Sequence, residues 1–210
     1  GFEQRRYPYR SNTYDRRYEA GGPQNSQLHT ERRTWVSSID STSGLVTDRT
    51  TRITEFYTGL YPSGIRTERE QHTSVLNDTT SWCLGRPQTT LTTASHTLTG
   101  GTAITRTTGQ TWDGANCRLQ QVQLEPGHAQ WQVTVAYGYD GFGNRASESV
   151  TGIGMSARTR TLNYGTRGQR PEQGTDPMGH STAQGWDYAL GVLTSVVDPN
   201  ALSTSWTHDS

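Results

Sequence analysis

The chain of 210 residues has no lysine: its 19 basic residues are all arginine, and 19 acidic residues balance them to a formal net charge of zero. A broad nucleic-acid surface needs excess cations to displace counterions, so this balance argues against a nucleic-acid partner. Cysteine is scarce, and Cys83 and Cys117 stand in no CxxC or other metal-binding spacing. Two cysteines allow one disulfide, but the sequence leaves their redox state open.

Apolar residues are also few, at 30% of the chain, so we do not expect a large conventional core. The sequence contains no apolar run that approaches a membrane span and no recognisable signal peptide. Disorder is disfavoured because the net charge is zero and six tryptophans and ten tyrosines are present. This composition favours a sheet that buries aromatic rings on one face.

Helical periodicity is missing from every segment of ten or more residues, whereas period-two patterns recur. Threonine is the commonest residue, and its branched Cβ suits a half-buried strand. The clearest predicted strand is WQVTVAYGY, residues 131–139. Its inner face would carry Trp131, Val133, Val135, Tyr137 and Tyr139. The sequence therefore predicts an all-β fold.

Three other stretches give local expectations. Gly100 and Gly101 separate two threonine-rich arms and predict a hairpin with a two-residue turn. Residues 41–59 predict either a strand pair or one long strand. The first thirty residues are polar and rich in arginine and tyrosine, and we expect an irregular entry segment there.

An internal repeat occupies the C-terminal third. Residues 176–187 (DPMGHSTAQGWD) and 198–209 (DPNALSTSWTHD) align without a gap at an offset of 22 residues. The identical pairs are Asp176 with Asp198, Pro177 with Pro199, Ser181 with Ser203, Thr182 with Thr204, and Asp187 with Asp209. A unit of this length predicts a hairpin that is marginal alone and stable when stacked on its neighbours.

Each repeat ends in a ring followed by aspartate, and the same ending occurs earlier at Tyr139–Asp140. Asp140 and Asp187 are 47 residues apart, which is not a multiple of 22. We therefore predict an insertion of a few residues within 162–176.

Residues 137–145, YGYDGFGNR, resemble the YD repeat of Rhs proteins, whose core is Tyr-x-Tyr-Asp-x-x-Gly followed by Arg or Asn-Arg. The matching positions are Tyr137, Tyr139, Asp140, Gly143, Asn144 and Arg145. The C-terminal 22 residues resemble the adjoining half of the unit at Gly191, Leu193, Thr194, Asp198, Pro199, Asn200 and Thr204. The chain departs from the pattern at Trp206 and His208, where the family prefers tyrosine, and at Ala201, where it prefers glycine.

The resemblance implies a YD-repeat β-hairpin array that forms part of a spiralling β-sheet shell. Residues 1–130 would be a Thr/Arg-rich β region and residues 131–210 the YD-repeat segment. In such proteins the shell encloses a C-terminal polypeptide, often a toxin, until delivery. Because the chain starts without methionine and stops within a repeat, we expect it to be a segment of a longer protein. That protein would be secreted, carried on the cell surface or translocated by a secretion apparatus.

The implied function is a non-catalytic wall segment without a cofactor, and its partners would be the rest of the polypeptide and its cargo. The alternative is a cell-surface module that binds carbohydrate or protein. Members of the family can cleave themselves with aspartates of a distinctive C-terminal segment. No stretch of this chain matches that segment, so we predict no catalytic residue.

Other chemistries have weaker signals. Gly141 and Gly143 give only GxG, without the third glycine, lysine and helix of a phosphate cradle. Asp140 and Asn144 offer oxygen ligands for calcium, but the EF-hand spacing is missing and hairpin turns are commonly rich in these residues. No GxSxG elbow occurs.

Glu68 and Glu70 would share a strand face, as a glycosidase carboxylate pair could. Arg66 and Arg69 beside them favour solvated charge pairing instead. The histidines at 29, 72, 96, 128, 180 and 208 form no HxxxH or HExxH pair. Residues 5–18 interleave arginine with tyrosine, which predicts either an anionic or glycan-binding patch or, as we favour, Arg–Tyr packing.

Overall fold

The computed structural model describes residues 11–18, 27–56 and 64–208. They form a sheet of fourteen antiparallel strands that follow one another in chain order. These described residues contain no α-helix and one 3-10 turn, Thr97–Thr99, so the predicted all-β fold is confirmed. No helix among them has the length and hydropathy of a membrane span. The chain divides into two compact units, Gly1–Arg118 and Leu119–Ser210, and each is described by itself.

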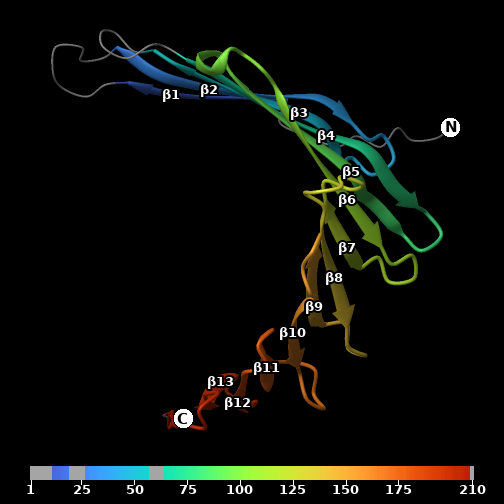
Figure 1. The fold of residues 1–210 in the computed structure, drawn as a ribbon, viewed down its shortest axis with the longest axis vertical. Coiled ribbons are helices and arrows are strands. Elements are labelled where there is room, and N and C mark those ends of the chain that lie inside the picture. The colour runs from blue at the N-terminus through green and yellow to red at the C-terminus, as the bar shows by residue number, and fades with distance from the viewer. Residues whose placement is uncertain (1–10, 19–26, 57–63, 209–210) are drawn as a thin grey trace. The chain divides into compact units, whose positions relative to one another are not determined.

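Unit 1 consists of the long strands coloured blue to green in Figure 1. Their bounds are β1 Asn12–Tyr18, β2 Leu28–Ile39, β3 Val46–Glu55, β4 Ile65–Asp78, β5 Cys83–His96 and β6 Ile104–Trp112. Threonine fills many of the cross-strand positions, and the hydroxyls of Thr34 and Thr51 hydrogen-bond across β2 and β3 at 3.0 Å. Branched residues of this kind pack well on a pleated surface, which explains why the polar sequence folds as a sheet.

The best buried region of unit 1 lies where β2, β3 and β4 run together. Thr50 of β3 stands opposite Trp35 of β2 and Arg69 of β4 and is 7% exposed. Asp48, 9% exposed, accepts a hydrogen bond from Nε of Arg69 at 3.0 Å. The buried carboxylate of Asp48 is therefore hydrogen-bonded, as burial requires.

Several local expectations for unit 1 change with the structure. Residues 12–18 and 28–30, expected to be irregular, belong to β1 and β2, because pairing with the next strand outweighs the polar composition; residues 1–10 and 19–26 lie outside the described part. Within residues 41–59 the described part forms one strand, β3. The hairpin around Gly100 and Gly101 is present and both have positive φ, at 79° and 72°. Its connection is longer than two residues, because it includes the 3-10 turn.

Unit 2 is built from shorter strands, coloured yellow to red in Figure 1. Their bounds are β7 Leu119–Leu124, β8 Val133–Tyr139, β9 Arg145–Gly152, β10 Arg158–Asn163, β11 Gln173–Thr175, β12 Ser181–Asp187, β13 Val192–Val197 and β14 Ser203–Ser205. The predicted strand at 131–139 is confirmed from Val133 onward. Trp131 instead lies in the preceding turn, where its ring stacks on His128 at 4.3 Å between centroids.

Neither unit has a conventional core. Among the described residues only Asp48, Thr50, Gly64 and Cys83 are buried, and most other strand residues are half-buried or exposed. The stability of such a sheet comes from its ladder of backbone hydrogen bonds, its cross-strand side-chain pairs and the connections that set its register.

Candidate functional site

Aspartates begin the turns that dominate the chemistry of this chain. In seven described turns the Oδ1 atom of an aspartate accepts the backbone N–H of the residue two positions later, at 2.8 to 3.2 Å. Aspartate favours such turns because its carboxylate satisfies N–H groups that the ladder leaves free. The seven are Asp40, Asp78, Asp113, Asp140, Asp176, Asp187 and Asp198.

Three of these turns have a short loop. In each, the backbone carbonyl of the aspartate accepts the N–H of the residue three positions later. Its carboxylate also accepts the N–H of the residue four positions later. The third residue has a left-handed backbone, as three-residue hairpin loops require. It is Gly143, Gly179 or Ala201, with φ of 93°, 85° and 63° respectively.

Four turns are one residue longer, and the left-handed residue is the fourth after the aspartate. It is Gly44 in the Asp40 turn, Trp82 in the Asp78 turn, Cys117 in the Asp113 turn and Gly191 in the Asp187 turn, with φ of 78°, 59°, 54° and 71°. Glycine adopts this conformation freely, whereas a residue with a Cβ pays about 1 to 3 kcal/mol. Trp82 and Cys117 are therefore strained positions.

A ring precedes the aspartate of the Asp113, Asp140 and Asp187 turns, and His208 holds the matching position of the last repeat. Each of these rings ties its segment to an earlier one. A polar group at the edge of each ring donates to a backbone carbonyl: Trp112 to Pro87, Tyr139 to Leu119, Trp186 to Pro171 and His208 to Leu193, at 2.7 to 2.8 Å. The last two bonds each span 15 residues. The donors Trp186 and His208 are 22 residues apart, and so are the acceptors Pro171 and Leu193. The sequence repeat therefore corresponds to two equivalent hydrogen bonds.

Glycine comes before two of these rings, at a β-bulge. The register shifts between Gly138 and Tyr139 and again between Gly185 and Trp186. A Cβ at either glycine would collide with the hydroxyl of the serine opposite it. Glycine leaves room for the serine hydroxyl at both bulges, which gives the Gly–ring–Asp order a steric reason.

Within unit 2, neighbouring turns also contact each other. Asn144 of the Asp140 turn donates its Nδ2 to the carbonyl of Gly168 at 2.7 Å. The ring of Phe142 lies where a Cβ on Gly168 would stand. These contacts join the β8–β9 turn to the β10–β11 connection, residues 164–172, which falls in the region where the sequence predicted an insertion.

In unit 1 the turns at 40–44, 78–82 and 113–117 follow β2, β4 and β6, so they lie at the same end of the strands. We call this set the aspartate edge of unit 1. Asn77 donates its Nδ2 to Oδ1 of Asp40 at 3.0 Å and accepts the N–H of Gly85 at 2.8 Å. One asparagine thus connects the first turn of the edge to the second.

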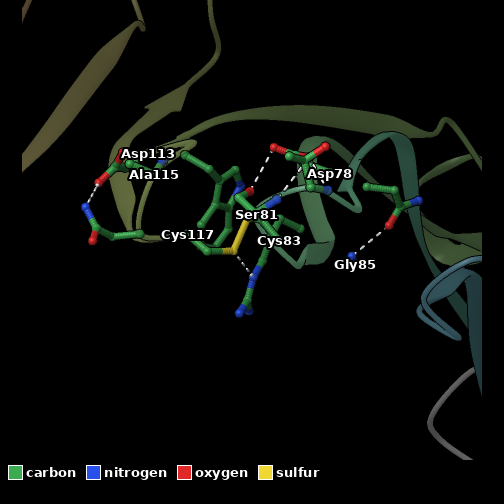
Figure 2. The surroundings of a disulfide bond; sticks show 12 residues. Asp78, Ser81, Cys83, Gly85, Asp113, Ala115 and Cys117 are labelled. Atoms are coloured by element: carbon green, nitrogen blue, oxygen red, sulfur yellow. Dashed lines mark hydrogen bonds between the residues drawn. A yellow bond between two sulfur atoms is a disulfide. The ribbon is translucent and has the colours of Figure 1, made fainter.

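A disulfide connects the second turn to the third (Figure 2). Cys83 and Cys117 are bonded with a Cα–Cα distance of 5.3 Å, which resolves the redox state that the sequence left open. Cys83 is completely buried. Nε of Arg86 lies 3.1 Å from Sγ of Cys117, and its guanidinium stacks over Trp112 at 5.3 Å.

The turn hydrogen bonds hold several carboxyl groups in their ionised form. Hydrogen bonds from the Ser43, Ser81 and Asn116 side chains lower the pKa of Asp40, Asp78 and Asp113, respectively. The N–H of His180 lowers the pKa of Asp176, and Arg69 lowers that of Asp48 by hydrogen bonding. For Asp140, desolvation acts upward, but the hydrogen bonds from Asn144 and the turn outweigh it and the pKa is lowered.

The residues predicted as the repeat motif fall mainly in these turns and the strands beside them. Pro177 and Pro199 follow Asp176 and Asp198, at a turn position that suits the fixed φ of proline. Arg145 stacks on Tyr137 at 4.0 Å and pairs with Glu148 at 3.0 Å. Asp209 lies outside the described residues, and the role of the set as a YD-repeat signature stays a prediction.

The acidic and basic residues considered for other chemistry are engaged in pairs. Glu68 pairs with Arg66, and Glu70 pairs with Arg49 at 2.5 Å, so the two carboxylates are held by different arginines. In the part of residues 5–18 that the structure describes, Arg16 bonds Glu31 at 2.7 Å. The glutamate contacts are the charge pairing that we expected. The Arg16 guanidinium also lies over the Tyr14 ring at 5.9 Å, a contact of the Arg–Tyr kind that we favoured.

The glycine loop at 141–143 and the histidines His72 and His180 belong to turns and cross-strand contacts. The Gly141–Gly143 loop leads into strand β9, not into a helix. His180 contacts Asp176 at 3.0 Å and His72 contacts Thr90 at 2.9 Å, so both act within a turn or across strands. Over the described part of the chain, no group of three or more His, Cys, Asp or Glu residues could hold a metal ion.

Sequence reasoning missed the turns of unit 1. A usable signal was present at Asp40, where Asp-x-x-x-Gly repeats the pattern of Asp187. The Asp78 and Asp113 turns lack it, because Trp82 and Cys117 replace the glycine. The ring–Asp pair Trp112–Asp113 was a second signal.

Comparison with known proteins gives the fold a context. No protein-family profile and no curated protein sequence matches the chain. Among solved structures, it is similar to the complex TcdB2-TccC3 without its hypervariable C-terminal region, with a TM-score of 0.56 at 10% identity over 94% of this chain. It is also similar to the Photorhabdus luminescens Tc holotoxin pore, with a TM-score of 0.54 at 9% identity over 90% of this chain.

This chain spans only 14% of the length of each of those two matched chains. Likeness at such low identity concerns the fold alone. The open antiparallel sheet of this chain thus shares its fold with a part of each of these two toxin-complex chains.

Proposed function

We propose that this chain is a non-catalytic wall segment of an Rhs-type shell that encloses a C-terminal toxin or effector belonging to the same polypeptide. The observation that carries the proposal is a fourteen-stranded, single-layer sheet without a core of its own, in a fold that Tc toxin chains share. A sheet with both faces largely uncovered has a physical reason when each face meets a different environment, cargo on one side and solvent on the other. Residues 131–210 would be its YD-repeat segment, and no cofactor would be needed.

The aromatic residues favour a wall over a binding module. Trp112, Tyr139 and Trp186 pack along strands and use their polar edges to bind backbone carbonyls of the sheet. Large rings with a polar tip are well suited to such cross-strand ties.

The proposal also concerns the parent polypeptide. It would be secreted, displayed at the cell surface or translocated by a secretion apparatus. The segment itself would contact the neighbouring strands of the shell and the cargo, and no nucleic acid. Its mechanism would be containment: a continuous sheet excludes both solvent and proteases from the enclosed cargo.

The test uses the parent polypeptide with its natural C-terminus. Intact mass and native size would be measured before and after added protease, with a heat-opened sample as the digestion control. We expect the C-terminal region to co-migrate with the remainder and to resist protease until the sheet is opened. Deletion of residues 131–210 should remove this protection. A C-terminal region that is digested at once in the undamaged protein would overturn containment and favour the binding-module alternative.

A further inference from the structure

We propose that Cys117 is a site of thiol–disulfide exchange, at which an external thiol opens the Cys83–Cys117 bond and releases two strained turns of the aspartate edge. The residues with a strained backbone and the disulfide occur in the same two turns. Of the four longer aspartate turns, two carry glycine at the left-handed position, and the other two carry Trp82 and Cys117. Those two are the turns that the disulfide connects. The inference concerns this bond and does not depend on whether the chain encloses a cargo.

Access decides which sulfur can be attacked. Cys83 has no exposed surface, whereas Cys117 is half-buried at the last position of its turn. A thiolate must approach the sulfur that it attacks along the axis of the sulfur–sulfur bond. Attack on Cys83 would require the sheet to open first, so exchange in the folded chain begins at Cys117.

The local charge favours an anionic attacker. The exposed Arg86 places its guanidinium Nε 3.1 Å from Sγ of Cys117. Arginine stays protonated at any working pH, so this cation attracts an approaching thiolate and stabilises the Cys117 thiolate once it forms. Stacking of Arg86 on Trp112 fixes the cation in that position.

The exchange is a two-electron reduction. A thiolate bonds to Sγ of Cys117, the sulfur–sulfur bond breaks, and its electron pair leaves on Sγ of Cys83, which takes a proton. A second thiol, or the second group of a dithiol, attacks the external sulfur of the mixed disulfide and releases Cys117. The external reductant leaves as its disulfide, and both cysteines end as thiols.

Reduction should loosen a defined part of unit 1. The ladder between β5 and β6 runs from the Ala94–Ile104 pair to the Thr89–Gly109 pair. Beyond it, the start of β5 is held to residues 110–118 by the disulfide, by the Trp112 bond to Pro87 and by Arg86. With the disulfide open, the turns that contain Trp82 and Cys117 can leave the left-handed conformation.

The first experiment maps the attack in the oxidised 210-residue chain. Three monothiols would be compared: mercaptoethanesulfonate (anionic), mercaptoethanol (neutral) and cysteamine (cationic). After a short reaction and an acid quench, alkylation and peptide mass mapping locate the adduct. We expect the thiol adduct on Cys117 and the alkyl label on Cys83, with the rate highest for the anionic thiol after correction for thiolate fraction. Adducts on Cys83, or reduction only in denaturant that unfolds unit 1, would overturn the assignment.

A matched pair of variants tests the role of Arg86. Arg86→Gln should lower the rate with the anionic thiol by at least about threefold and bring the three rates closer together, because it removes the local positive potential. Arg52→Gln removes an exposed arginine of β3 and should leave the rates unchanged. Equal effects of both variants would mean that net charge alone sets the rate, and the local role of Arg86 would be rejected.

A third measurement tests the strain. Trp82→Gly should shift the thiol–disulfide equilibrium toward the disulfide by about fivefold, because the oxidised form then loses its strained residue. Gly179→Ala, in unit 2, is the control and should leave the equilibrium unchanged. In the unaltered chain, reduction should speed amide hydrogen exchange at 79–83 and 114–118. No change in exchange there would refute the release of the turns.

Discussion

The two units contain the same kind of aspartate turn, but they differ in strand length and in the contacts that hold the strands together. Unit 1 has strands of up to fourteen residues, an ion pair between the buried Asp48 and the exposed Arg69, and a disulfide across its aspartate edge. Unit 2 has strands of three to eight residues and, in its described part, relies on ring-to-carbonyl bonds and the Asn144–Gly168 contact. Long ladders and a covalent bond let unit 1 keep Trp82 and Cys117 in a strained conformation.

Of the four described aspartate turns of unit 2, three carry glycine at the left-handed position and the fourth carries Ala201. Glycine is thus the more frequent residue at this position in unit 2, whereas in unit 1 the two turns without glycine are the pair that the disulfide connects.

Loss of the disulfide should lower the free energy of unfolding of unit 1 much more than that of unit 2. The Cys83→Ser, Cys117→Ser double variant should lower the free energy of unfolding of unit 1 by about 3 to 4 kcal/mol, because the bond closes a loop with a sequence separation of 34. Urea titration followed by site-resolved hydrogen exchange would report each unit separately. An equal loss in unit 2 would show that the units do not unfold independently.

Removal of a turn carboxylate should act within unit 2. Asp140→Ala removes the acceptor of the Phe142 and Asn144 N–H groups and should cost about 1 to 2 kcal/mol, because those donors lose their partner. Asp140→Asn keeps one oxygen acceptor and should cost less. Urea midpoints of the two variants would be compared, and equal costs would contradict the hydrogen-bond explanation.

The two aligned repeats offer a reciprocal exchange. Ala201→Gly should stabilise its turn and Gly179→Ala should destabilise the matching turn, each by about 1 kcal/mol, because both positions have positive φ. Thermal unfolding of the two single variants and the double variant would test this. The double variant should unfold near the original temperature; a shift of the same sign in both single variants would argue against the left-handed assignment.

Acid should weaken unit 1 more than unit 2, although the effect per group is small because most of these carboxylates are only half-buried and remain screened by solvent. The pKa is lowered at Asp40, Asp48, Asp78 and Asp113 in unit 1 and at Asp140 and Asp176 in unit 2. A carboxyl with a lowered folded pKa stabilises the fold above its unfolded pKa of about 3.9 and loses that contribution as the pH falls through the folded value.

The measurement is hydrogen exchange or urea unfolding at pH 7 and at several values below 4, at low salt. Asp48→Asn provides a control, because it removes the one lowered carboxyl that is buried. Its pH dependence in unit 1 should be shallower than that of the unaltered chain. An identical dependence in both chains would place the acid sensitivity elsewhere.

Much of the fold could be predicted from residue patterns. The period-two alternation in residues 133–139 predicted β8, and the paired glycines at 100 and 101 predicted the reversal between β5 and β6. Predictions failed where local sequence was ambiguous. The polar residues 12–18 form β1 because β2 offers a complete ladder, and Trp131 leaves the strand pattern to stack on His128.

The turns could be predicted where the left-handed residue is glycine, because glycine marks that conformation directly. At Asp78 and Asp113 the marker is missing, and only the paired strands show that Trp82 and Cys117 occupy the same position as Gly44 and Gly191. The ring-to-carbonyl bonds were likewise hidden, because each joins residues that are 15 to 25 positions apart.

The sequence by itself determined the all-β class, the 22-residue spacing of the C-terminal turns and the absence of a large core, because these depend on composition and on order along the chain. The tertiary structure decided which turns face each other, that Cys83 and Cys117 are bonded, and that Arg86 lies beside the sulfur. Those contacts depend on the register of β4, β5 and β6. Many weak cross-strand pairs set that register together, so it cannot be predicted from any single pair.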